Sequence, residues 1–84
     1  MPLEERSLLE LIQQYRRLKH GGAGQHEREV AQARLNALVD EAHRGGDRIL
    51  CALATDARHA PIDMTEAYLL ELLQVMRVRR AAGK

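Results

Sequence analysis

Apolar residues recur along this chain at the three- and four-residue spacings that mark amphipathic helices. Residues 3–20 carry one such stripe, formed by Leu8, Leu11, Ile12, Tyr15 and Leu18. Glutamates lie near the start of this segment and basic residues near its end, as the helix dipole favours. Gly21 and Gly22 follow, and because glycine readily adopts the left-handed conformation that ends helices, they predict a stop.

Residues 26–44 predict a second amphipathic helix. One of its faces is apolar and carries Ala31, Leu35, Leu38, Val39 and Ala42. Its alanines favour close approach of another helix, and Gly45 and Gly46 predict its end. We interpret the resemblance between the two helix endings as shared capping chemistry and not as an internal repeat.

The third segment, residues 48–58, is harder to assign because its run from Ile49 to Ala54 is uniformly apolar. Such a short run fits either a buried helix or a strand. The chain offers no β-rich segment with which a single strand could pair, and Asp47 is a good residue to cap a helix. We therefore expect a helix.

Residues 60–63 predict a turn, since Pro61 disfavours a helical conformation in the preceding residue. Asp63 and Glu66 have the spacing of a capping box, which predicts a last helix over residues 64–81. Its stripe of Leu69, Leu72, Leu73 and Met76 is widened by Tyr68, Leu70, Val75 and Val78. A helix this broadly apolar is either the central member of a bundle or offers a second face to another chain. The sequence leaves both interpretations open.

These segments predict an all-α fold, a compact bundle of about four helices. The 84 residues form one small domain with a short basic carboxyl-terminal tail. The chain has no Trp or Phe, and Tyr15 and Tyr68 are its aromatic residues, so leucine and alanine must build the core. Small domains without large rings or staples often gain stability by association.

Composition narrows the setting of the protein. A net charge of +1 gives no strong field toward nucleic acid or membrane. The longest apolar run has six residues, against about 20 for a membrane span, so we expect no membrane association. A single cysteine and an acidic start, unlike a secretory signal, favour the cytoplasm. Abundant arginine and alanine are typical of a GC-rich bacterial coding sequence.

Candidate chemistry is sparse. Cys51 lies in the apolar run, which favours a core residue over a reactive thiol. His43 and His59 each follow an aspartate by three residues, a spacing that invites a metal site, but no His-x-x-x-His or paired-cysteine motif is present. We expect surface histidines, no metal, no cofactor and no catalytic residue. No catalytic constellation is found, so we do not expect an enzyme, and a small enzyme that uses Cys51 stays a third hypothesis.

The leading functional hypothesis is a non-catalytic protein–protein interaction module, with another protein or a second copy as its partner. We expect the last helix to carry the interaction face, formed by Leu69, Leu70, Leu73, Met76, Arg77 and Arg80. The alternative is a nucleic-acid-binding regulator that contacts phosphates through the basic end of that helix. Its candidate phosphate contacts are Arg77, Arg79, Arg80 and Lys84.

Overall fold

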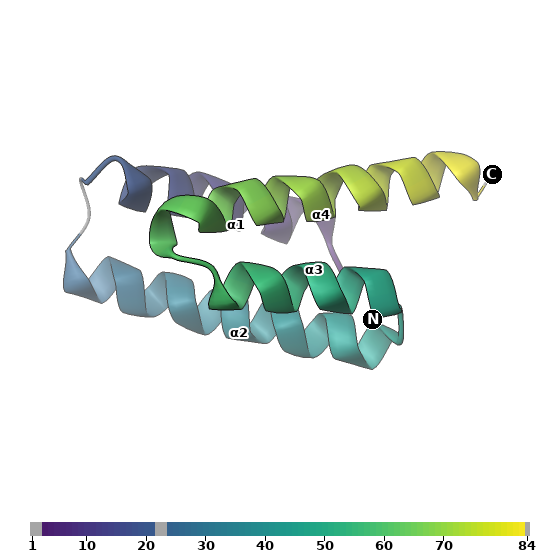
Figure 1. Ribbon diagram of the computed structural model, residues 1–84, viewed down its shortest axis with the longest axis horizontal. Coiled ribbons are helices and arrows are strands. Elements are labelled where there is room, and N and C mark those ends of the chain that lie inside the picture. The colour runs from purple at the N-terminus through teal and green to yellow at the C-terminus, as the bar shows by residue number, and fades with distance from the viewer. Residues whose placement is uncertain (1–2, 22–23, 84) are drawn as a thin grey trace.

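The computed structural model, which describes residues 3–21 and 24–83, is the predicted all-α bundle (Figure 1). No strand occurs in the described part of the chain. The four helices are α1 (Glu5–Lys19), α2 (Gln25–Gly45), α3 (Arg48–His59) and α4 (Ile62–Ala82). The predicted helices are thus confirmed, with ends that differ by one or two residues.

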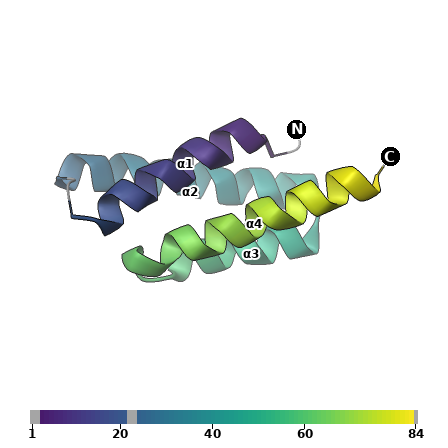
Figure 2. The same cartoon turned by 90° about the horizontal axis from the view of Figure 1, so that it is seen from above.

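The helices run alternately up and down and stand at the four corners of a square. Each helix packs against its neighbour in the chain, and α1 also packs against α4, which closes the square. Seen from above, α1 and α2 lie on one side of the molecule and α3 and α4 on the other (Figure 2). The bundle measures 41 × 20 × 19 Å, and the last turns of α4 extend beyond α3 (Figure 1).

The core lies along the axis of this square. Both stripes predicted for the first two helices are buried in it. The fifteen buried apolar residues are Leu8, Leu11, Ile12, Tyr15, Leu18, Ala31, Leu35, Leu38, Val39, Ala42, Ala54, Ala57, Leu69, Leu72 and Leu73. The short helix α3 contributes Ala54 and Ala57, whose small side chains allow its backbone to approach the core closely.

Helix ends follow the predicted capping chemistry at three points. The carboxylate of Asp47 accepts hydrogen bonds from the backbone N–H groups of Ile49 and Leu50, at 3.0 and 3.1 Å, and so caps α3. Gly21 and Gly46 have φ values of 79° and 75°, in the left-handed region that glycine adopts without strain. These two glycines end α1 and α2. Gly22 lies outside the described residues.

The predicted capping box at the start of α4 is wrong. The helix begins at Ile62, and Pro61 occupies the cap position with its carbonyl accepting from the N–H groups of Met64 and Thr65, at 2.8 and 3.2 Å. Pro61 has an extended ψ of 152° and stays outside the helix, but its carbonyl accepts the first helical hydrogen bonds, so the helix starts two residues before the predicted position. Asp63 therefore lies inside the first turn, and the predicted turn shrinks to residues 60–61.

Within the described residues, no helix is long and apolar enough to span a bilayer.

Candidate interaction face

The outer surface of α4 carries a second row of side chains, separate from those that build the core. Its members alternate in steps of four and three residues, the spacing that keeps side chains on one face of a helix that packs against another. We call this the α4 row: Met64, Tyr68, Glu71, Val75, Val78 and Ala82. All six are exposed or half-buried, and all but Glu71 are apolar or aromatic.

Contacts on both flanks of α4 fix the direction of this row. On one flank, Glu66 pairs with Arg16 of α1 and Arg77 pairs with Glu5, each at 2.7 Å. On the other flank, Thr65 donates a hydrogen bond to the Ala57 carbonyl of α3 at 3.4 Å. Met64 immediately precedes Thr65, and one residue turns the helix by about 100°, in the direction away from Glu66 and α1. The row therefore lies on the outside of α4, next to α3.

A matching row lies on the outer side of α3. It steps by four and then three residues, and we call it the α3 row: Ile49, Leu53 and Asp56. The opposite side of α3 is marked by Cys51, whose sulfur contacts His43 of α2. The α3 row therefore borders α4, and the two rows form one surface, the α3/α4 face.

The α3/α4 face contains the three most exposed large apolar side chains among the described residues. Val78 is 57 %, Ile49 53 % and Met64 47 % exposed. Leu53 and Tyr68 are half-buried and pack against the core, so they line the junction between the helices. Both helices lie side by side toward the viewer in Figure 1.

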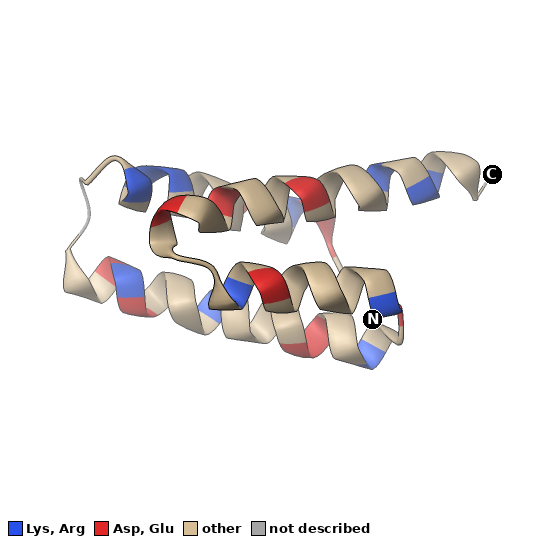
Figure 3. Cartoon of the chain, in the orientation of Figure 1, with Lys and Arg blue, Asp and Glu red and all other residues tan. Residues whose placement is uncertain are grey.

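Each row contains one acidic residue, Asp56 at the end of the α3 row and Glu71 near the middle of the α4 row. Both are exposed, and among the described residues neither forms an ion pair. Figure 3, which has the same orientation, shows acidic bands along α4 and basic bands toward its carboxyl end, and on α3 one acidic band between basic bands near the two ends of the helix. The face therefore combines apolar side chains with uncompensated negative charge.

The residues predicted to form an interaction face on α4 do not share one surface. Leu69 is fully buried and Leu73 is 5 % exposed, and both belong to the core of this chain. Met76 is half-buried against the core. Leu70 is 42 % exposed, on the flank that faces α1. Most of the exposed apolar surface of α4 thus belongs to the α4 row, and Leu70 is the one exposed apolar residue of the predicted face.

The predicted arginines at the end of α4 are held by carboxylates. Glu5 accepts from Arg77 Nε at 2.7 Å and from Arg80 Nη1 at 2.6 Å. The hydrogen bond from Arg77, together with the positive charge and hydrogen bond of Arg80, holds the pKa of Glu5 below its ordinary value of 4.5. Arg79 pairs with Asp47 at the start of α3. Lys84 lies outside the described residues.

These ion pairs surround a hollow at the end of the bundle. It has a volume of about 380 Å³, and its apolar lining comes from Leu3, Leu50 and Met76. Because α1, α3 and α4 all contribute to it, the paired charges bind the overhanging end of α4 to the starts of the other two helices. We therefore interpret these ion pairs as a structural clamp that holds the end of α4 in place.

Cys51 and His43 form the one pairing of chemical interest that the sequence did not predict. Cys51 packs against the core but is half-buried, so the prediction of a core cysteine holds only in part. Its sulfur lies 3.2 Å from Nδ1 and 3.3 Å from Nε2 of His43. Nearly equal distances place the sulfur beside the ring and not in line with one nitrogen, which is a poor geometry for proton transfer. Among the described residues, no three potential metal ligands converge.

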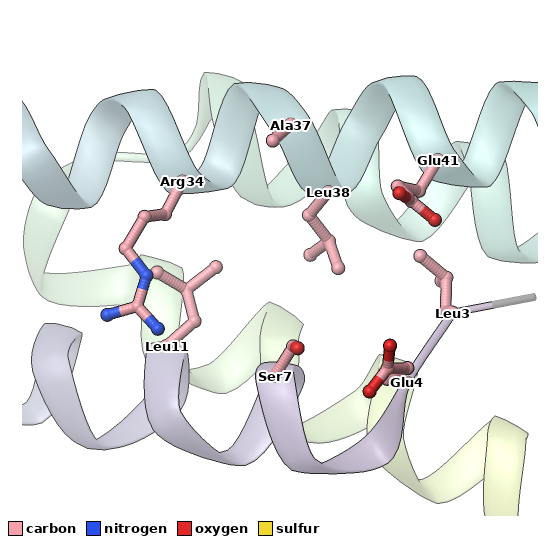
Figure 4. A pocket seen from close by; sticks show the side chains of 8 residues that line it. All are labelled: Leu3, Glu4, Ser7, Leu11, Arg34, Ala37, Leu38 and Glu41. Atoms are coloured by element: carbon pink, nitrogen blue, oxygen red, sulfur yellow. The ribbon is translucent and has the colours of Figure 1, made fainter.

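A shallow groove separates α1 from α2 near the start of α1 (Figure 4). Its volume is about 230 Å³, below the range of ordinary small-molecule sites. Leu11 and Leu38 form its apolar base, with Ser7 between them on the α1 side. Arg34 at one end is already engaged with Gln14 at 2.8 Å and Glu10 at 3.1 Å. The groove is a less convincing site than the α3/α4 face.

Comparisons of the chain with protein-family models, curated proteins and solved structures give no match. The face is therefore interpreted from its own residues. A sequence signal for it exists, because the alternating steps of four and three residues run from Met64 to Ala82. Three members of the row, Tyr68, Val75 and Val78, are among the residues that widen the predicted apolar stripe of this helix. The predicted interaction face did not include them, because the larger leucines of the inner stripe dominate the pattern.

Proposed function

We propose that this protein is a non-catalytic interaction module that binds a helix of another protein across its α3/α4 face. The observation that carries the proposal is the placement of Ile49, Met64 and Val78, the most exposed large apolar side chains of the described chain, on one surface. Exposed apolar groups that gather on one face of a small protein typically mark a protein contact. Two parallel rows with helical spacing suit an incoming helix.

The size of the face indicates a transient complex. Complete burial of a side chain such as Ile, Met or Val contributes about 1.5 to 3 kcal/mol. The row residues are already partly covered, so a partner would add about 1 kcal/mol for each of them. The sum over the apolar residues of both rows is on the order of 7 kcal/mol, from which the cost of association is still to be subtracted. We therefore expect a modest affinity.

The ion pairs of the basic residues weigh against the alternative, a nucleic-acid-binding regulator. Phosphates would have to displace Glu5 from Arg77 and Arg80, and Asp47 from Arg79. Displacing these carboxylates would break the ion pairs and release the end of α4 from α1 and α3. Arg77 and Arg80 are better explained as structural residues, and the interaction module is the function we put forward.

Paired substitutions test the proposal. The variant Ile49→Gln with Val78→Gln makes the face polar. Glutamine has a good helix propensity, so both helices should still form. Its matched control is Leu9→Gln with Val30→Gln, which changes exposed apolar residues on α1 and α2. Tagged chains would capture partners from extract of the native cell, and each recovered protein would then be purified and titrated against all three chains.

We expect the face variant to weaken binding of the purified partner at least tenfold, and the control variant to bind like the unmodified chain. Equal binding by both variants would show that the contact lies elsewhere. Far-ultraviolet circular dichroism of each chain verifies that the helices remain intact.

A further inference from the structure

We infer that the partner helix carries a lysine or arginine in the middle of its apolar stripe, and that it is not a second copy of this chain. The inference rests on the proposed function and names the chemistry of the partner. Its basis is the position of Asp56 and Glu71, which lie in otherwise apolar rows and have no ion-pair partner among the described residues.

A helix that covers the α3/α4 face also covers these two carboxylates. Desolvating a carboxylate without a partner is unfavourable, so a fully apolar stripe would be penalised at this point. A basic side chain opposite Asp56 and Glu71 compensates that penalty and fixes the register of the incoming helix, as polar residues do inside coiled-coil seams. The face thus selects a basic amphipathic helix.

The same residues disfavour self-association through this face. In an antiparallel pair of α4 rows centred on Glu71, Met64 would meet Val78 of the second copy and Tyr68 would meet Val75. These contacts are apolar and favourable, but Glu71 would then meet its own equivalent. Like charges brought together at an interface oppose binding, so the acidic residue acts against the homodimer that the apolar pattern would otherwise promote.

The charge of the whole chain does not explain such a preference. The net charge is +1, so long-range attraction would if anything favour an acidic partner. A preference for a basic helix must then arise locally, from the two carboxylates on the face. This contrast makes the inference testable with model ligands.

The probes are two synthetic amphipathic helical peptides of about 18 residues, long enough to follow the α4 row at about 1.5 Å per residue. They share one leucine stripe and differ at its two central positions, which are lysine in one peptide and glutamate in the other. Binding to the full chain is measured by fluorescence anisotropy. Sedimentation velocity of the chain alone reports its oligomeric state.

We expect the lysine peptide to bind at least about tenfold more tightly than the glutamate peptide. The variant Asp56→Asn with Glu71→Gln should reduce this ratio to about twofold or less. The matched control, Glu29→Gln with Asp40→Asn, removes two exposed acids from α2 and should keep the ratio. The chain should sediment as a monomer.

One result would overturn the inference and leave the proposed function intact: equal affinity for both peptides with a loss of binding in the Ile49→Gln, Val78→Gln variant. A dimer that this same variant dissociates would overturn both the inference and the proposed function, because it would identify a second copy as the occupant of the face. Absence of binding by either peptide, or binding that the face variant leaves unchanged, would overturn the proposed function together with the inference.

Discussion

At the scale of single residues, Asp47 performs two tasks that can be separated. One oxygen of its carboxylate caps α3 through the N–H groups of Ile49 and Leu50, and the carboxylate also pairs with Arg79 of α4. The cap is a local interaction that the sequence predicts. The ion pair joins residues far apart in the chain and becomes visible only in the fold.

Asp47→Ala removes both interactions, whereas Asp47→Asn keeps a good capping oxygen and removes the charge. We expect the alanine variant to lower the free energy of unfolding by about 1 kcal/mol, the usual value of a cap. The asparagine variant should lower it by less than about 0.5 kcal/mol, since a partly exposed ion pair contributes little. Urea unfolding followed by circular dichroism measures both. Equal losses would mean that the ion pair, and not the cap, is the main contribution of Asp47.

At the scale of helices, the carboxyl end of α4 depends on Glu5, and this dependence is sensitive to pH. Pairing with Arg77 and Arg80 lowers the pKa of Glu5 below 4.5 in the folded chain. A carboxylate whose pKa is lowered by folding stabilises the fold at any pH above its ordinary pKa. This stabilisation is lost as the pH falls through the pKa that the carboxylate has in the folded chain. We therefore expect acid to weaken the hold of Glu5 on the carboxyl end of α4.

Glu5→Gln should lower the urea midpoint at about pH 7, and it should make a smaller difference at an acidic pH below the lowered pKa of Glu5, where the charge of the carboxylate is lost. The control is Glu27→Gln, which changes an acidic residue in the first turn of α2 in the same way. Glu27 has no ion pair among the described residues, so this control reports the effect of the helix dipole alone. A Glu5→Gln effect of the same size at both pH values would contradict the pairing.

The helices also show how far the sequence determines the fold and the face. The stripes of α1 and α2 are narrow, and each fits only one orientation, so both buried faces are predicted correctly. On α4 apolar residues surround most of the helix, and only tertiary contacts decide which of them are buried. Leu69 entered the core while Val78 stayed exposed because α1 and α3 approach from fixed flanks, as the contacts of Arg77 and Thr65 show.

At the scale of the whole molecule, the square of helices is closed unevenly. Helices α1 and α2 pack against each other least, and the groove of Figure 4 lies between them. Ser7 and Ala37, which line the groove, have small side chains, while Leu11 and Leu38 at its base are already buried, at 2 % and 7 % exposed. A larger apolar side chain at position 7 would therefore gain contacts across the groove without uncovering the core.

Ser7→Leu should fill part of the groove and raise the free energy of unfolding by about 1 kcal/mol, as cavity-filling substitutions commonly do. Ser7→Ala is the control, because alanine improves helix propensity by up to about 0.5 kcal/mol without reaching Leu38. The difference between the two variants in urea unfolding therefore measures the packing between α1 and α2 alone. If leucine stabilises no more than alanine, the two helices approach more closely in solution than the groove implies. Because the groove lies on the side of the square opposite the α3/α4 face, the substitution should leave peptide binding unchanged while it raises stability.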